Sequence, residues 1–313
     1  MTIKPEILLP RVAPLRLWAT HAALIVVQVA FASQAVEGKI AMLPRAVGGE
    51  EIAPFAVAMV RMLGAAVFFQ ALARSMGWLK PVSLRDHVWL ALLSILGIAL
   101  NQALFLLGLR STTPMSAALL GITIPVLTAA LAVAFRQEKA SARTAVGLVV
   151  ACSGVVWLIA GEGGNAAVDR GALIISANCL SYSAYIVLSR SVIRRLGAFT
   201  VVTWIFTWAA LLFAPFGASA LVHGAGEWTA RGWLFLAYIV VVPTIIAYVA
   251  NAWALGRSNA SLVTVYIYVQ PLITAVLAWV QLGHTVSPRI AIASALIMLG
   301  VAIVSSRARQ NLA

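Results

Sequence analysis

The sequence has few charged residues and few cysteines. Only 10% of its 313 residues are Asp, Glu, Lys or Arg, whereas a soluble domain carries roughly 25%. A soluble fold could not cover its surface with so few polar groups, and 62% hydrophobic residues exclude a disordered chain. Two cysteines exclude a disulfide scaffold and a cysteine-rich zinc site. The remaining class is a polytopic membrane protein, for which the mean hydropathy of +0.99 is typical.

Ten apolar stretches are long enough to cross a membrane, which takes about 20 mostly apolar residues. Arg61 is the one full charge inside them. The first stretch has an alternative interpretation as a cleaved signal peptide, since basic residues precede it and Ala30-Phe31-Ala32 resembles a cleavage site. We expect a retained helix because the apolar run continues past that site. The predicted spans are 18–36, 53–73, 87–109, 114–135, 144–161, 171–189, 199–222, 232–254, 259–282 and 290–306.

The net charge of +13 would suggest nucleic acid in a soluble protein. Here the basic residues follow the topology instead. With the N-terminus inside, 15 of the 22 basic residues lie in cytoplasmic segments and six in outer loops, as the positive-inside rule requires. An even number of spans also returns the C-terminus, with Arg307 and Arg309, to the cytoplasm. We therefore expect a lipid bilayer and no nucleic acid as partner.

The chain repeats itself at an offset of 146 residues. From Pro125 against Pro271 to Val155 against Val301, ten of 31 positions are identical, against about three expected from such a composition. Each copy holds five spans, and an odd number makes the second copy enter from the opposite side of the membrane. The predicted fold is therefore an all-α membrane protein of ten helices in two inverted repeats, 18–161 and 171–306, with cytoplasmic tails 1–17 and 307–313. Inverted repeats are typical of transporters, although a duplicated receptor or enzyme scaffold is an alternative.

Polar, aromatic and proline residues lie at characteristic places in the predicted spans: Gln28, Phe31-Ala32-Ser33, Gly38-Lys39, Arg61, Asn101-Gln102, Pro125, Glu138, Asn178, Tyr182, Tyr185, Pro243-Thr244, Asn251, Tyr266 and Gln270-Pro271. In this set of residues the sequence resembles the drug/metabolite transporter superfamily, specifically the EamA-type ten-helix permeases, over residues 20–306. The resemblance implies two EamA repeats and the export or uptake of small metabolites such as amino acids. One departure is His284, where the family usually has Glu, opposite Glu138.

Arg61 lies eight residues into its span, where a charge costs about 2.5–3.5 kcal/mol on insertion scales. It either faces a central cavity and meets a substrate carboxylate or phosphate, or bonds helix carbonyls and holds its helix in place. Seven amides at membrane depth likewise either join helices or bind a polar ligand group. The candidate substrate-binding residues are Gln28, Phe31, Arg61, Asn101, Asn178, Tyr182, Tyr185, Trp204, Tyr266 and Gln270.

Pro125 and Pro271 each remove a backbone hydrogen bond inside a predicted span. They are candidate gating residues for alternating access, or else fixed kinks. Small residues in spans 144–161 and 290–306 predict close helix packing, within the chain or in a homodimer.

No Asp or Glu lies within a span except Glu37 at an outer end. Proton-coupled carriers use intramembrane carboxylates, so we expect a facilitator or exchanger, or weak coupling through Glu37. The sequence predicts no catalytic residue, metal or cofactor, and the glycine run after residue 160 lacks the lysine of a phosphate loop. The leading prediction is a secondary transporter of small amphipathic metabolites, and the resemblance implies a bacterial inner membrane as its location. A receptor or an intramembrane enzyme is the alternative.

Overall fold

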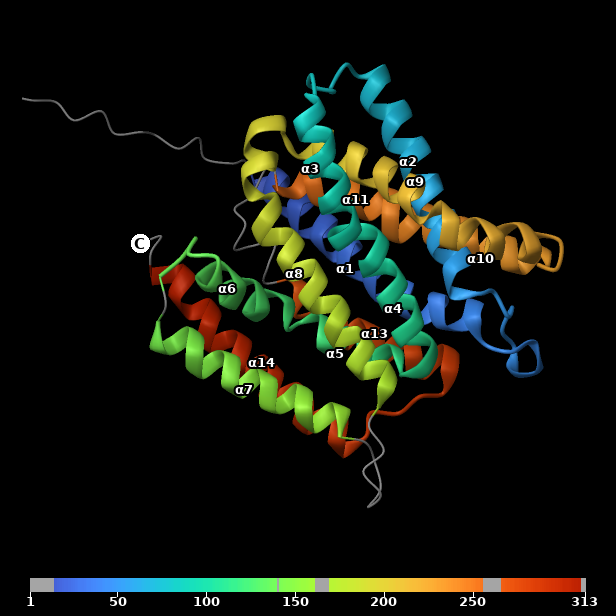
Figure 1. Ribbon diagram of the computed structural model, residues 1–313. Helices are drawn as coiled ribbons and strands as arrows, with labels where there is room; N and C mark the ends of the chain where they lie inside the picture. Colours follow the sequence, from blue (N-terminus) through green and yellow to red (C-terminus); the bar gives the residue numbers. More distant parts are fainter. Residues whose placement is uncertain (1–13, 140, 161–168, 256–265, 311–313) are drawn as a thin grey trace, which may run out of the picture.

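A computed structural model describes residues 14–139, 141–160, 169–255 and 266–310. Its regular structure is helical throughout these residues. The longer helices are α1 (Pro14–Met42), α2 (Pro54–Ser75), α3 (Leu84–Ser94), α4 (Leu100–Ser111), α5 (Pro114–Gly121), α6 (Ile124–Ala134), α7 (Ala142–Ile159), α8 (Arg170–Leu196), α9 (Ala198–Ala225), α10 (Ala230–Val240), α11 (Ala247–Leu255), α13 (Gln270–Leu282) and α14 (Pro288–Gln310) (Figure 1).

Eight helical segments of the described residues are long and apolar enough to cross a membrane. They correspond to the first eight predicted spans. Two further apolar helices, Gln270–Leu282 and Pro288–Val304, are shorter. The start of the predicted span 259–282 lies outside the described residues. The predicted boundary between the third and fourth spans is confirmed, since α4 ends at Ser111 and α5 begins at Pro114.

Short polar side chains mark where helices begin. Thr113, Ser141 and Thr229 each accept a hydrogen bond from the third backbone N–H that follows them. Asp169 does the same before α8. Each cap satisfies one of the N–H groups that a helix leaves unpaired at its start, so these residues fix where α5, α7, α8 and α10 begin.

Two prolines occupy places that the sequence analysis did not predict. Pro125 and Pro271 lie in the first turns of α6 and α13 rather than inside a continuous helix. A proline costs nothing there because its missing N–H would be unpaired in any case. The predicted span 114–135 is thus two helices, with the break at residues 122–123.

In the part of the chain that the structure describes, each half has a π-helical turn within a long apolar segment. The first, η2 (Ile95–Ala99), joins α3 to α4, and the second, η3 (Val241–Ile246), joins α10 to α11. They begin 146 residues apart, which is the repeat offset, and Gly97 of the first corresponds to Pro243 of the second. Glycine destabilises the interior of an α-helix, and proline has no N–H to donate to the preceding turn. These properties give a local reason for a π turn at both places.

The helices pack in corresponding pairs across the two halves. Helix α8 packs against α4 and α6, and α1 packs against α11 and α13. Helices α2 and α9 pack against each other, as do α7 and α14 along one edge of the molecule (Figure 1). A Cβ on Gly300 of α14 would lie 2.5 Å from the carbonyl oxygen of Gly147 of α7. The expected close packing of small residues is therefore present within the chain.

Candidate functional site

Arg61 of α2 is buried, with 3% of its surface exposed. Its Nε donates a hydrogen bond to Thr244 Oγ1 of η3 at 2.7 Å, and its Nη1 donates to Gln102 Oε1 of α4 at 2.6 Å. The structure therefore joins this guanidinium to side chains from two other helices, one in each half. The predicted alternative of bonds to helix carbonyls is not what the described residues show.

The π turn η3 places Thr244 beside Arg61. Thr244 Oγ1 donates to the carbonyl oxygen of Ile239, five residues earlier, at 3.0 Å. Pro243 precedes it and cannot donate a backbone hydrogen bond. Because the hydroxyl donates to this carbonyl, its oxygen is oriented to accept from the Arg61 Nε.

A chain of amides extends from Arg61 to α8. Gln102 Nε2 donates to Asn101 Oδ1 at 3.3 Å. Asn178 Nδ2 of α8 donates to the backbone oxygen of Asn101 at 2.6 Å, and Asn101 Nδ2 lies 3.5 Å from the backbone oxygen of Asn178. All three amides are buried. Two predicted candidates, Asn101 and Asn178, thus belong to one network with Arg61.

No carboxylate of the described residues bonds to the Arg61 guanidinium. The Arg61 Nη2 donates no hydrogen bond to any described residue. An arginine has five N–H donors and no acceptor. A buried charge is normally paired, because an unpaired one loses its hydration without compensation. The neutral oxygens of Gln102 and Thr244 solvate the charge only in part.

A cluster of aromatic rings lies within electrostatic range of this charge. Tyr248 of α11 lies within electrostatic range of Arg61, and its ring contacts those of Phe31, Phe69 and Phe206 at centroid distances of 5.5–6.3 Å. Tyr248 occupies the position that corresponds to Gln102 at the repeat offset. The site therefore combines the positive charge of Arg61 with the aromatic rings around Tyr248.

Tyr182 and Tyr185 of α8 pack together with a centroid distance of 5.7 Å. Tyr182 is also within electrostatic range of Arg61. Tyr185 lies over Gly97 of η2, where a Cβ would come within 2.6 Å of its ring. The absence of a side chain at Gly97 therefore leaves room for the Tyr185 ring.

Four predicted candidates have no hydrogen bond or ring contact with this network in the described residues. Trp204 packs against His87, with a centroid distance of 4.5 Å, near the start of α9. Tyr266 accepts from or donates to His21 Nδ1 through its hydroxyl at 2.6 Å. Gln28 is buried with its Oε1 unbonded, and Gln270 is the first residue of α13. Their roles stay predictions.

The comparisons with known proteins agree on one family. The model of the EamA-like transporter family matches residues 18–160 and 169–306. The chain is 28% identical over 204 residues to the uncharacterized transporter YdfC of Bacillus subtilis, covering 64% of this chain and 65% of that one. It is 26% identical over 251 residues to a probable terminal-alkyne amino-acid exporter of Streptantibioticus cattleyicolor, covering 80% and 84%. A crystal structure 20% identical in sequence matches with a TM-score of 0.57 over 95% of this chain and 99% of its own.

The apolar helices and these matches define a multi-pass membrane protein of a transporter type. The two family matches together cover most of the sequence, and the chain belongs to the EamA-like transporter family. The resemblance noted from the sequence is thereby confirmed. The names of the family and of the relatives point to transport rather than to an enzyme.

Proposed function

We propose that this protein is a secondary transporter that moves small carboxylate-bearing metabolites, such as amino acids, across a bacterial inner membrane by alternating access. The observation that carries the proposal is Arg61, a buried guanidinium without a carboxylate partner among the described residues. A substrate carboxylate would complete its bonding, since carboxylates fit a guanidinium with two parallel hydrogen bonds.

The rings beside Arg61 support an amphipathic substrate. The Tyr248 ring, with Phe31 and Phe69 around it, offers an apolar contact surface next to the charge. Ligand sites of this kind combine mostly apolar walls with a few polar groups that fix orientation. In this proposal Arg61 holds the carboxylate, and the rings contact the rest of the molecule.

Alternating access is supported by the correspondence of the two halves. The packing of α8 on α4 and α6 corresponds to that of α1 on α11 and α13, and the two π turns begin at the repeat offset. These features are expected of two five-helix repeats with opposite orientation, between which transporters place their site. Arg61 reaches from the first half to Thr244 of the second, so a change in the relative position of the halves would change the site.

The orientation of the chain is part of the proposal. The excess of basic residues in the predicted inner segments favours cytoplasmic N- and C-termini. The name of the Streptantibioticus relative describes export of an amino acid, which supports an amino-acid-like substrate here. No carboxylate is joined to the Arg61 network in the described residues, which favours a facilitator or exchanger over proton coupling.

The test is transport by the purified protein in liposomes. We expect saturable uptake of at least one member of a panel of labelled amino acids. R61Q should lose about 10- to 150-fold in transport efficiency, since a charge-assisted pair with the substrate is worth roughly 1.5–3 kcal/mol and each 1.4 kcal/mol is a factor of ten. R61K should keep part of the activity because the charge remains.

Arg74 provides a matched control, because it is an exposed arginine in the last turn of the same helix. R74Q should transport like the wild type. Equal transport by R61Q and the wild type would contradict the role of Arg61, and no saturable flux across the panel would contradict the substrate class.

A further inference from the structure

A buried carboxylate joins the first turn of α3 to the end of α8. Ser83 caps α3 and donates through Oγ to Asp86 Oδ2 at 2.7 Å, and the Asp86 N–H donates to Ser83 Oγ at 3.2 Å. The other carboxylate oxygen of Asp86, Oδ1, lies 2.5 Å from Arg195 Nη2 of α8, and the Asp86 side chain is 8% exposed. Because α3 belongs to the first half of the chain and α8 to the second, this ion pair connects the two halves.

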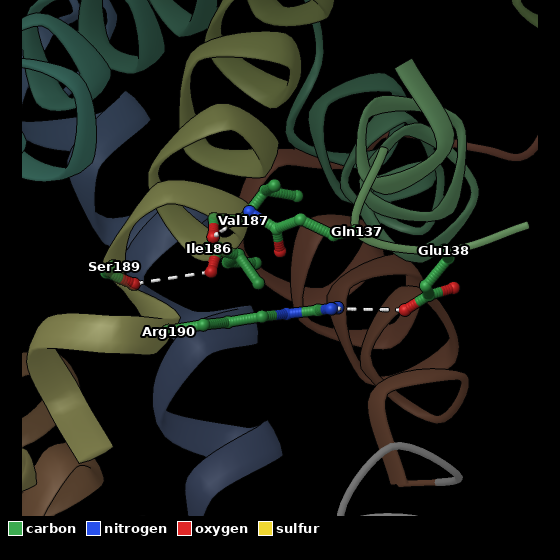
Figure 2. A network of polar contacts seen from close by, with 6 residues as sticks. All are labelled: Gln137, Glu138, Ile186, Val187, Ser189 and Arg190. Carbon is green, nitrogen blue, oxygen red and sulfur yellow. Dashed lines mark hydrogen bonds and ion pairs between the residues drawn. The ribbon is translucent and has the colours of Figure 1, made fainter. Parts of the chain in front are cut away.

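A second ion pair connects the halves at the same end of α8. Glu138 Oε1, in the turn between α6 and α7, accepts from Arg190 Nη1 at 3.1 Å (Figure 2). Gln137 of the same turn donates through Nε2 to the backbone oxygen of Val187 at 3.3 Å. Both side chains of this ion pair are more than 40% exposed. We therefore expect it to contribute less than the buried carboxylate of Asp86.

The first turn of α10 has the same cap as α3 but no carboxylate of its own. Thr229 corresponds to Ser83 at the repeat offset of 146 residues, and its Oγ1 accepts from the Gly232 N–H at 3.1 Å. Gly232 corresponds to Asp86. A glycine at this place has no side-chain oxygen that could accept from the hydroxyl of the cap.

Glu50, in the loop between α1 and α2, supplies this carboxylate from the other half. Thr229 Oγ1 donates to Glu50 Oε2 at 2.5 Å, and a Cβ on Gly232 would lie 3.3 Å from the same oxygen. Glu50 Oε1 lies 3.7 Å from Arg231 Nε, and the Glu50 side chain is 5% exposed. The carboxylate of Glu50 thus has the same two kinds of partner as that of Asp86, a cap hydroxyl and an arginine.

The two carboxylates lie at opposite ends of the bundle. Glu50 precedes α2 and Asp86 follows it, and the 22 residues of α2 span about 33 Å at roughly 1.5 Å per residue. Both carboxylates belong to the first half, and Thr229, Arg231 and Arg195 belong to the second. Each end therefore has a buried polar contact between the halves.

An apolar cluster follows one turn further along α10. The guanidinium of Arg231 lies over the ring of Phe235, 5.2 Å from its centroid. Phe235 packs against a cluster of buried side chains, Val36 and Ile40 of α1 and Ala278 of α13. These side chains come from both halves and fill the space between the three helices. A passage that opens at this end has to separate them.

We propose that Glu50 is a gating residue, whose contact with Thr229 and Arg231 must break for the end at α10 to open, and that Asp86 with Arg195 has the same role at the other end. A cap for α10 alone would need only an aspartate at position 232, as α3 has at Asp86. The use of a carboxylate from the α1–α2 loop also ties that loop to the second half. The proposal rests on the proposed function, since alternating access requires the two ends to open separately.

Opening is measured by the labelling rate of single cysteines with a charged maleimide, on the full chain in phosphatidylcholine nanodiscs. Nanodiscs expose both ends of the bundle to the reagent. Cys152 and Cys179 are first replaced by alanine. V36C reports on the end at α10, and L90C reports on the end at Asp86, one turn earlier in α3. Val36 and Leu90 are both 0% exposed, so both cysteines should react slowly in the wild-type background.

E50A should raise the labelling rate of V36C about tenfold or more, because it removes a hydrogen bond to a charged group, and should leave that of L90C unchanged. R195A should raise the rate of L90C and leave that of V36C unchanged. E51A is the matched control, since Glu51 is the next residue of the same loop and is exposed. It should leave both rates unchanged.

The double variant E50A/G232D separates gating from capping. It gives α10 a carboxylate in its own first turn, as Asp86 does for α3, but does not connect the halves. The rate of V36C should therefore stay raised, whereas a merely structural cap would be restored and the rate would return to that of the wild type. This return would overturn the proposal, as would an unchanged rate in E50A or an equal rise of both cysteines, which would show general unfolding. Because labelling needs no substrate, a failed transport assay would contradict the proposed function without changing this result.

Discussion

The substitution Gln102→Glu distinguishes an arginine that binds substrate from one that only holds helices together. Gln102 Oε1 already accepts from Arg61 Nη1 at 2.6 Å. The substitution changes one amide nitrogen to oxygen and keeps the shape of the side chain. It provides Arg61 with a carboxylate inside the protein, in the position that we assign to the substrate.

The size of the effect follows from Coulomb's law. Two unit charges 4 Å apart attract by about 4 kcal/mol at an effective dielectric constant of ~20. An internal carboxylate would offset this attraction between Arg61 and the substrate, and each 1.4 kcal/mol corresponds to a factor of ten. The expected result is a rise in KM of roughly 1,000-fold.

The assay is initial uptake in proteoliposomes, with thermal unfolding measured on the same preparations. Q102E should unfold near the temperature of the wild type, because it strengthens the Arg61 contact and loses the bond from Gln102 Nε2 to Asn101 Oδ1. Q70E is the matched control, since Gln70 of α2 also bonds to another helix, through its Nε2 to Thr207 Oγ1 of α9, and has no bond to Arg61. Wild-type KM in a stably folded Q102E would refute the reasoning, since a purely structural arginine tolerates a stronger partner.

Two further results are expected. Replacement of Gly300 by Leu should destabilise the protein by about 1–3 kcal/mol in thermal unfolding, because its Cβ would meet backbone atoms of α7 such as the Gly147 oxygen at 2.5 Å. Gly121→Leu is the control, since a Cβ on Gly121 faces open space. Equal stability of the two variants would argue against tight packing of α7 on α14. Glu37→Gln should keep full flux driven by a substrate gradient, since the new amide oxygen can still accept from Gln281 Nε2, and a loss of proton-gradient-driven flux in this variant would instead show coupling through Glu37.

Much of the helical architecture can be predicted from the sequence, because long apolar runs have few alternatives to membrane helices. Thr113 and Pro114 identify the boundary between two closely spaced spans, and the structure has it there. The breaks before Pro125 and Pro271 were harder to predict. A proline accounts equally well for a kink and for a first helical turn, and only the backbone distinguishes the two.

The partners of Arg61 could not be derived from sequence patterns. Thr244 reaches the guanidinium because η3 is a π turn, which shifts the register of the following residues. The correspondence of Gly97 and Pro243 at the repeat offset was a usable signal for such a turn. Trp204 was predicted to belong to the site, yet it lies near the start of α9 and contacts His87 of α3. Depth is set by position along a helix, whereas contact depends on its rotation and packing.

The most direct test of the central claim compares counterflow of a transported amino acid and of its carboxamide in liposomes that contain the wild type or R61Q. If Arg61 binds the substrate carboxylate, the wild type exchanges the acid far better than the amide, and R61Q loses this preference. An R61Q protein that still prefers the acid by the same factor would contradict the account.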